Sequence, residues 1–116
     1  NLSLEYMMRG DTARAISLLN EALRRDPNFS TAHANLAILN MEMCEYSAAR
    51  LHAYEAIRLG MREPLLYRVA GYSSFYLNNY PDAVLSLKEY LKSAPADGNV
   101  RTLLNDVERR LGQYRP

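Results

Sequence analysis

Small and apolar residues recur along this chain with a period of 34 residues, and no gap is needed to keep the register. Alanine occupies the same position of three successive periods, at Ala15, Ala49 and Ala83. Other columns are almost as uniform: Leu2, Leu36, Ala70 and Leu104; Leu19, Ala53 and Leu87; Leu23, Ile57 and Leu91. Such self-similarity indicates a stack of like supersecondary units, because one unit alone cannot bury its apolar face.

Within each period the apolar residues follow the spacing of α-helices. Ala15, Leu19 and Leu23 share one helical face, and their equivalents in the next two periods repeat it. A second helical stripe precedes the later faces, as Leu36 and Leu39 show. The pattern predicts an all-α fold without strands, with helices at about 1–9, 12–25, 31–43, 46–59, 64–77, 80–93 and 98–112.

Residues that break helices fall where paired helices are expected to turn. Gly10 is predicted to end the first helix and Asp11 to cap the second, because glycine adopts the left-handed conformation and aspartate accepts from free N–H groups. Pro81 suits the first turn of its helix, where a missing N–H is tolerated. The first helix starts in mid-pattern at Leu2, so we expect a missing turn or further units upstream.

These features together resemble the tetratricopeptide repeat: a 34-residue helix pair with small residues at the crossing, Tyr46 and Tyr80 after the inner turn, and Asp26-Pro27 closing a unit. The resemblance implies a right-handed α-solenoid of antiparallel helix pairs, with about three repeats and a C-terminal capping helix. It implies one domain over 1–116, with a partial unit at 1–29, units at 30–63 and 64–97, and the cap at 98–112. The cap would cover the third unit with Leu103, Leu104, Val107 and Leu111.

Composition narrows the class of function. Lys plus Arg number 14 against 13 for Asp plus Glu, so the net charge of +1 lacks the basic footprint of a nucleic-acid binder. The single cysteine, Cys44, has no partner for an internal disulfide. No secretory signal is seen, and no apolar run approaches the roughly 18 residues of a membrane span. The compartment stays open, with the cytoplasm favoured.

Residues suited to catalysis or metal binding are sparse. Cys44 as nucleophile with His52 as base is one conceivable pair, but both occupy ordinary turn and helix columns of the repeat. His33, His52 and Cys44 show no metal-binding spacing, such as two histidines four residues apart. We therefore expect no enzyme, no metal and no cofactor.

The resemblance implies that a concave groove, lined by the first helices of the units, holds a peptide or a partner helix. Leu65, Val69, Tyr72 and Tyr76 recur at four, three and four residues and would form an apolar line along that groove. The alternative is that part of this line packs between neighbouring units or against the last helix. The predicted partner-binding residues are Leu4, Met8, Asn35, Ile38, Met41, Leu65, Arg68, Val69, Tyr72 and Tyr76.

The family's best-known groove chemistry is a clamp of Lys, Arg and Asn that grips the C-terminal carboxylate of chaperone tails. Only Asn35 matches it here, while Leu65 and Val69 stand where the cations would be. The predicted function is therefore a non-enzymatic adaptor, scaffold or chaperone that binds an apolar segment of another protein. The alternatives are a self-associating structural scaffold, with the chain as a homo-oligomer, and a bacterial secretion chaperone by analogy.

Overall fold

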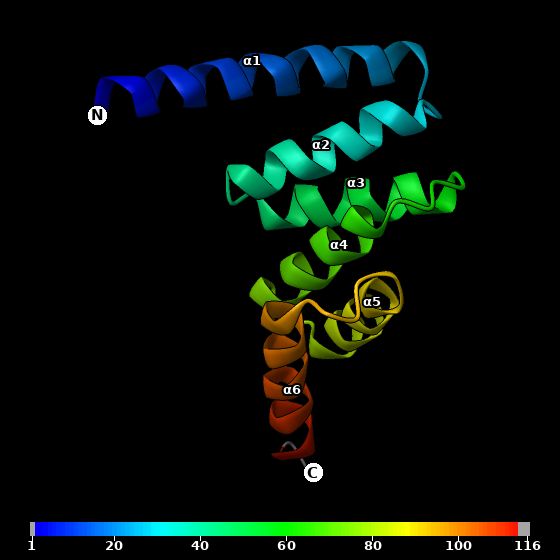
Figure 1. The fold of residues 1–116 in the computed structure, drawn as a ribbon. Coiled ribbons are helices and arrows are strands. Elements are labelled where there is room, and N and C mark those ends of the chain that lie inside the picture. The colour runs from blue at the N-terminus through cyan, green and yellow to red at the C-terminus, as the bar shows by residue number, and fades with distance from the viewer. Residues whose placement is uncertain (1, 114–116) are drawn as a thin grey trace.

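The computed structural model describes residues 2–113 of the chain, and the side chains of residues 9–112. This part folds into helices without strands, which confirms the all-α prediction (Figure 1). Six helices follow one another: α1 (Leu2–Arg25), α2 (Ser30–Glu42), α3 (Tyr46–Arg58), α4 (Pro64–Tyr76), α5 (Tyr80–Ser93) and α6 (Gly98–Gln113). None of them, within the described residues, is both long and apolar enough to cross a membrane.

The helices pack as a helical-repeat solenoid. Each helix contacts the next one along the chain, and α2 also contacts α4, so the first helices of the two hairpins α2–α3 and α4–α5 lie side by side. Figure 1 shows the hairpins following one another from α1 at one end to α6 at the other. This arrangement gives α2 and α4 a common exposed surface.

Both hairpins turn at a residue with left-handed backbone conformation. Cys44 has φ 58° and Asn78 has φ 62°, in the column where the sequence has Gly10 one period earlier. The N–H groups of the following residues, Glu45 and Asn79, donate back to carbonyls of the first helix at 2.9 and 2.8 Å. These bonds satisfy carbonyls that would otherwise be left free at the helix end.

The predicted turn at Gly10 is wrong. Instead of two helices at 1–9 and 12–25, α1 runs without interruption through Gly10 and Asp11, so that Asp11 lies inside a helix and caps nothing. A Cβ atom at Gly10 would meet nothing within 4 Å, so no other helix packs against this point. A helical glycine is only about 1 kcal/mol less favourable than alanine. This cost does not end a helix when no tertiary contact stabilises a turn at that point.

Small residues allow the helices of the later units to approach closely. Ala49, Ala53, Ala70 and Ala83 are fully buried, as the alanine columns predicted. At Gly71 the approach is closest, because an added Cβ would lie 2.5 Å from Cδ2 of Leu87 on α5. Unlike its counterparts, Ala15 is only half-buried, because residues 2–9 do not fold back to cover it.

The last helix closes the C-terminal end of the described core. Leu104 and Val107 are buried as predicted, and Leu103 and Leu111 are half-buried. The helix starts where Asp97 accepts from the N–H of Val100 at 3.2 Å and from the hydroxyl of Tyr90 at 2.7 Å. The bond from Tyr90, followed by that from Val100, lowers the pKa of Asp97.

Candidate partner-binding groove

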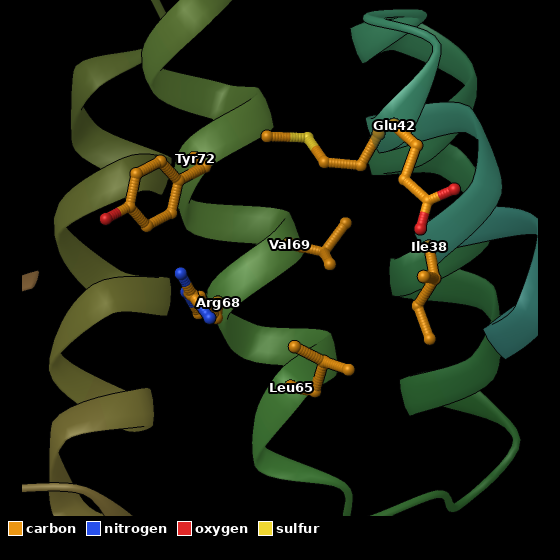
Figure 2. Close-up of a pocket in the computed structure, with 7 residues that line it drawn as sticks. Ile38, Glu42, Leu65, Arg68, Val69 and Tyr72 are labelled. Carbon is orange, nitrogen blue, oxygen red and sulfur yellow. The ribbon is translucent and has the colours of Figure 1, made fainter. Parts of the chain in front are cut away.

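A pocket of about 250 Å³ opens between α2 and α4, and we call it the α2–α4 groove (Figure 2). Its lining comprises Ile38, Met41 and Glu42 of α2 with Leu65, Arg68, Val69 and Tyr72 of α4. Six of the ten predicted partner-binding residues therefore lie around one hollow, and Glu42 is an addition that the sequence analysis missed. The signal for Glu42 was its position one helical turn after Ile38.

Helical spacing explains why these side chains meet. Residues 65, 68, 69 and 72 are separated by three, one and three positions, which places them on one face of α4. Residues 38, 41 and 42 form the matching face of α2. Because α2 and α4 are in contact, the two faces converge on the same space.

The groove combines apolar walls with two charges. Figure 2 shows Val69 and Ile38 facing each other across the hollow, with Leu65 beside them. Glu42 and Arg68 are exposed and carry opposite charges. The guanidinium carbon of Arg68 lies 5.6 Å from the ring centroid of Tyr72, within cation–π distance.

Val69 lines the groove, but it is almost fully buried, so the apolar line predicted along α4 is not exposed over its whole length. Its side chain is 6% exposed and belongs to the core cluster that includes Leu66 and Ala70. Tyr72 is half-buried and packs against the cluster of Leu87 and Val100. The physical reason is the contact of α2 with α4 on one side and the covering by α5 and α6 on the other, so the alternative of internal packing applies to these two residues.

The remaining predicted residues lie elsewhere. Tyr76 is 50% exposed, but it is absent from the groove lining and stacks on Tyr46 of α3, with ring centroids 4.5 Å apart. Asn35 is exposed on α2 and lines a different pocket, beside α1. Leu4 and Met8 lie outside the residues whose side chains the structure describes. A partner-binding role for these four residues stays a prediction.

A histidine pair that sequence reasoning missed joins α2 to α3. Nδ1 of His33 lies 3.0 Å from Nδ1 of His52, and Nε2 of His33 lies 2.9 Å from the carbonyl oxygen of Pro27. With the Nε2–H of His33 donating to that carbonyl, its Nδ1 accepts from His52. The 19-residue separation gave no helical signal for this contact. His52 is thus engaged with His33, while Cys44 is exposed at the turn beside Tyr46.

The described residues offer little for metal chemistry. They contain no group of three or more histidine, cysteine, aspartate or glutamate side chains arranged to hold a metal ion. The two histidines alone fall short of the three or four protein ligands of ordinary zinc sites.

The histidine pair predicts a fall in stability in mildly acidic solution. Burial, followed by the nearby His33, lowers the pKa of His52 below its ordinary value of 6.5, against the opposing effect of Glu55. The unfolded chain then binds more protons than the folded one. The contribution of the neutral His52 to the free energy of unfolding is fully present above about pH 6.5. It is lost as the pH falls from there through the lowered pKa of His52. Thermal unfolding followed by circular dichroism at about pH 7.5 and pH 5.5 should show a lower Tm at the acidic value.

His52→Asn supplies the control for this pH dependence, because asparagine keeps a polar group but does not titrate. Its Tm should change less between the two pH values than that of the unaltered chain. The pKa values of Glu55 and Asp97 are lowered from 4.5 and 3.8, so these carboxylates titrate below the tested range. An equal fall in the variant would contradict the assignment.

Comparison with known proteins accords with the helical stack. The family model described as tetratricopeptide repeat matches residues 6–52. Three solved structures superpose on the chain with TM-scores of 0.74 to 0.80: YrrB, the first TPR of Spaghetti (RPAP3), and MamA. These comparisons show that the chain has the fold of the tetratricopeptide repeat (TPR). The structures that share this fold are 18 to 20% identical to the chain in sequence. No curated protein matches it in sequence.

The three solved structures differ in how much of each one the chain spans. YrrB is 20% identical over 89% of the chain, which spans 53% of YrrB, and it is described as a TPR protein with an unusual peptide-binding site. The Spaghetti domain is 18% identical over 94% of the chain, which spans 89% of it, and it is bound to the HSP90 peptide SRMEEVD. MamA is 18% identical over 97% of the chain, which spans 66% of MamA. The TPR fold is in general a protein-interaction module.

Proposed function

We propose that the α2–α4 groove binds an apolar segment of a partner protein, extended or helical, and that the chain acts without catalysis as an adaptor, scaffold or chaperone. The observation that carries this proposal is the convergence of Ile38, Leu65 and Val69 on one open hollow at the surface shared by α2 and α4. Apolar side chains on an open surface are stabilised when a partner removes them from water.

The size of the groove favours a side chain over a free small molecule. Its volume of about 250 Å³ lies below the roughly 300 to 1,000 Å³ of pockets that enclose drug-sized ligands. One or two apolar side chains of a peptide would fill it. Met41, with a flexible thioether, adapts to anchors of different shape.

The two charged residues of the groove favour particular charges in the partner segment. Glu42 and Arg68 favour a partner in which the apolar anchor is flanked by residues of opposite charge. Arg68 is the only cation that the described residues bring to the lining, and Leu65 and Val69 provide no charge for a terminal carboxylate. This groove lining opposes recognition of an acidic C-terminal tail.

A peptide titration with a matched pair of leucine variants tests the proposal. The probe is a short fluorescein-labelled peptide with leucine, isoleucine and phenylalanine anchors separated by serine and glycine. Binding followed by fluorescence anisotropy should weaken at least about tenfold in Leu65→Glu, equal to about 1.4 kcal/mol, because the new charge must be desolvated against the anchor. Leu65 is 42% exposed, so the substitution leaves the core in place.

Leu85→Glu is the control, because Leu85 is 69% exposed on α5 and lies outside the groove lining. It should bind the peptide like the unaltered chain. A second peptide with the anchors replaced by serine should not bind. Equal affinity of the two leucine variants, or no difference between the two peptides, would overturn the groove assignment.

A further inference from the structure

A second pocket, of about 430 Å³, lies between α1 and α2, and we call it the α1–α2 pocket. No charged side chain lines it among the residues whose side chains the structure describes. Its lining comprises Ala15, Leu18 and Leu19 of α1 with Asn35, Ile38 and Leu39 of α2. Leu18 is 67% exposed, and Ala15, Leu19 and Leu39 are only half-buried.

One period later, the equivalent surface is covered. The positions 34 residues after the pocket lining are Ala49, His52, Ala53, Val69, Tyr72 and Ser73. Four of them, Ala49, Ala53, Val69 and Ser73, are buried. The covering element is α2, which contacts both α3 and α4 and contributes Ala37 and Met41 to their core cluster. The α1–α2 pocket therefore continues this interface by one repeat, but none of the helices that the structure describes covers it.

The sequence identifies the segment that suits the pocket. Residues 2–8 occupy the columns of residues 36–42 in α2, and they place Ser3 opposite Ala37 and Met7 opposite Met41 in the alignment of repeats. Glu5 is the one charged residue of this segment, so its low charge suits a pocket whose described lining is uncharged. In the structure these residues continue α1 in a straight line, and Figure 1 shows that end of α1 projecting past α2. The segment of the same chain thus points away from the pocket.

We propose that the α1–α2 pocket receives residues 2–8 of a second copy of this chain, in a reciprocal exchange that forms a two-fold dimer. Each copy places this segment over the pocket of the other, so the interface reuses contacts that the repeat already makes between α2, α3 and α4. Such an exchange of identical elements is a low-cost route to a dimer. The uninterrupted backbone through Gly10 allows the segment to reach a second copy.

The first test is the mass of the chain in solution, measured by light scattering over a wide range of concentration. The unaltered chain should reach twice its 13.2 kDa mass as concentration rises. Leu18→Glu should remain at the monomer mass, whereas Leu85→Glu, at an equally exposed leucine, should dimerise normally. A monomeric unaltered chain, or the same behaviour of both variants, would overturn the proposal.

The second test identifies the element exchanged. In the α2–α4 groove Met41 lies with Val69 and Tyr72, so by the repeat Met7 should lie near Asn35 and Ile38 of the other copy. The variant Met7→Cys with Asn35→Cys, in a Cys44→Ser background, should oxidise to a dimer with a disulfide between positions 7 and 35, because such bonds require Cα atoms within about 7 Å. Mass spectrometry of the digested product locates the bond.

The control variant is Met7→Cys with Leu85→Cys, in the same Cys44→Ser background. It should give no specific disulfide between positions 7 and 85. An intramolecular bond between 7 and 35 at monomer mass would overturn the exchange, since the chain would then close on itself, and so would the absence of any bond. This result is independent of the proposed function. Leu65→Glu should still dimerise, and Leu18→Glu should still bind the apolar peptide.

Discussion

Leu66→Ala is expected to lower the free energy of unfolding by about 3 kcal/mol, within the range of about 2 to 5 kcal/mol for buried leucines. Leu66 is 1% exposed and packs in the cluster with Ala49, Ala53 and Val69, beneath the α2–α4 groove. The substitution removes apolar contacts and leaves a cavity that the surrounding small residues cannot fill. Against a typical stability of about 5 to 15 kcal/mol, the loss is a large share of the total. Urea unfolding at constant m-value measures it.

The adjacent residue provides the matched control. Leu65 is 42% exposed in the groove, and Leu65→Ala should change stability by about 0.5 kcal/mol or less. Leu65→Ala should nevertheless weaken binding of the apolar peptide, so two neighbouring leucines separate folding from binding. If both alanine variants were destabilised alike, the orientation of α4 described here would be wrong.

Gly71→Val is expected to destabilise the chain by about 3 kcal/mol through overpacking. Even the Cβ atom would stand 2.5 Å from Cδ2 and 2.8 Å from Cγ of Leu87, and the backbone nitrogen of Leu87 is 3.4 Å away. Leu87 is fully buried, which leaves its side chain little room to move. The helices α4 and α5 would have to separate. Thermal and urea unfolding should both report the loss.

A double-mutant cycle isolates this clash. Leu87→Ala creates space, so Gly71→Val should be less destabilising in the Leu87→Ala background than in the unaltered chain, by a coupling of about 1 kcal/mol or more. Gly112→Ala serves as a further control, because an added Cβ there meets nothing within 4 Å. That variant should be as stable as the unaltered chain or slightly more so. Additive effects at positions 71 and 87 would contradict the close approach.

Local pattern was sufficient for much of the fold. The 34-residue columns predicted α2 to α6 to within a few residues, because their alanines and leucines alternate with polar residues at the helical period. The same spacing predicted that Leu65, Val69 and Tyr72 would lie along one groove, and these residues line the same hollow. These features follow from helix geometry together with the contact between α2 and α4, which the repeat itself imposes.

Three features depended on contacts between distant residues. Whether Gly10 ends a helix depends on a packing partner, since glycine only weakens a helix and the left-handed turn must be stabilised elsewhere. The pairing of His33 with His52 requires two faces of different helices to meet, which no helical period encodes. The burial of Val69 depends on how closely α2 crosses α4.

The sequence by itself determined the all-α fold class, the helices after the first, and the apolar character of the groove. These features are set by the periodic spacing of side chains within one segment of the chain. Only the tertiary structure decided that α1 continues through Gly10, that Val69 forms part of the core, and that no described helix covers the surface beside Ala15 and Leu18. The physical reason is that a side chain is buried only where another segment of the chain packs against it. Each of these outcomes therefore depends on which neighbouring helix excludes water.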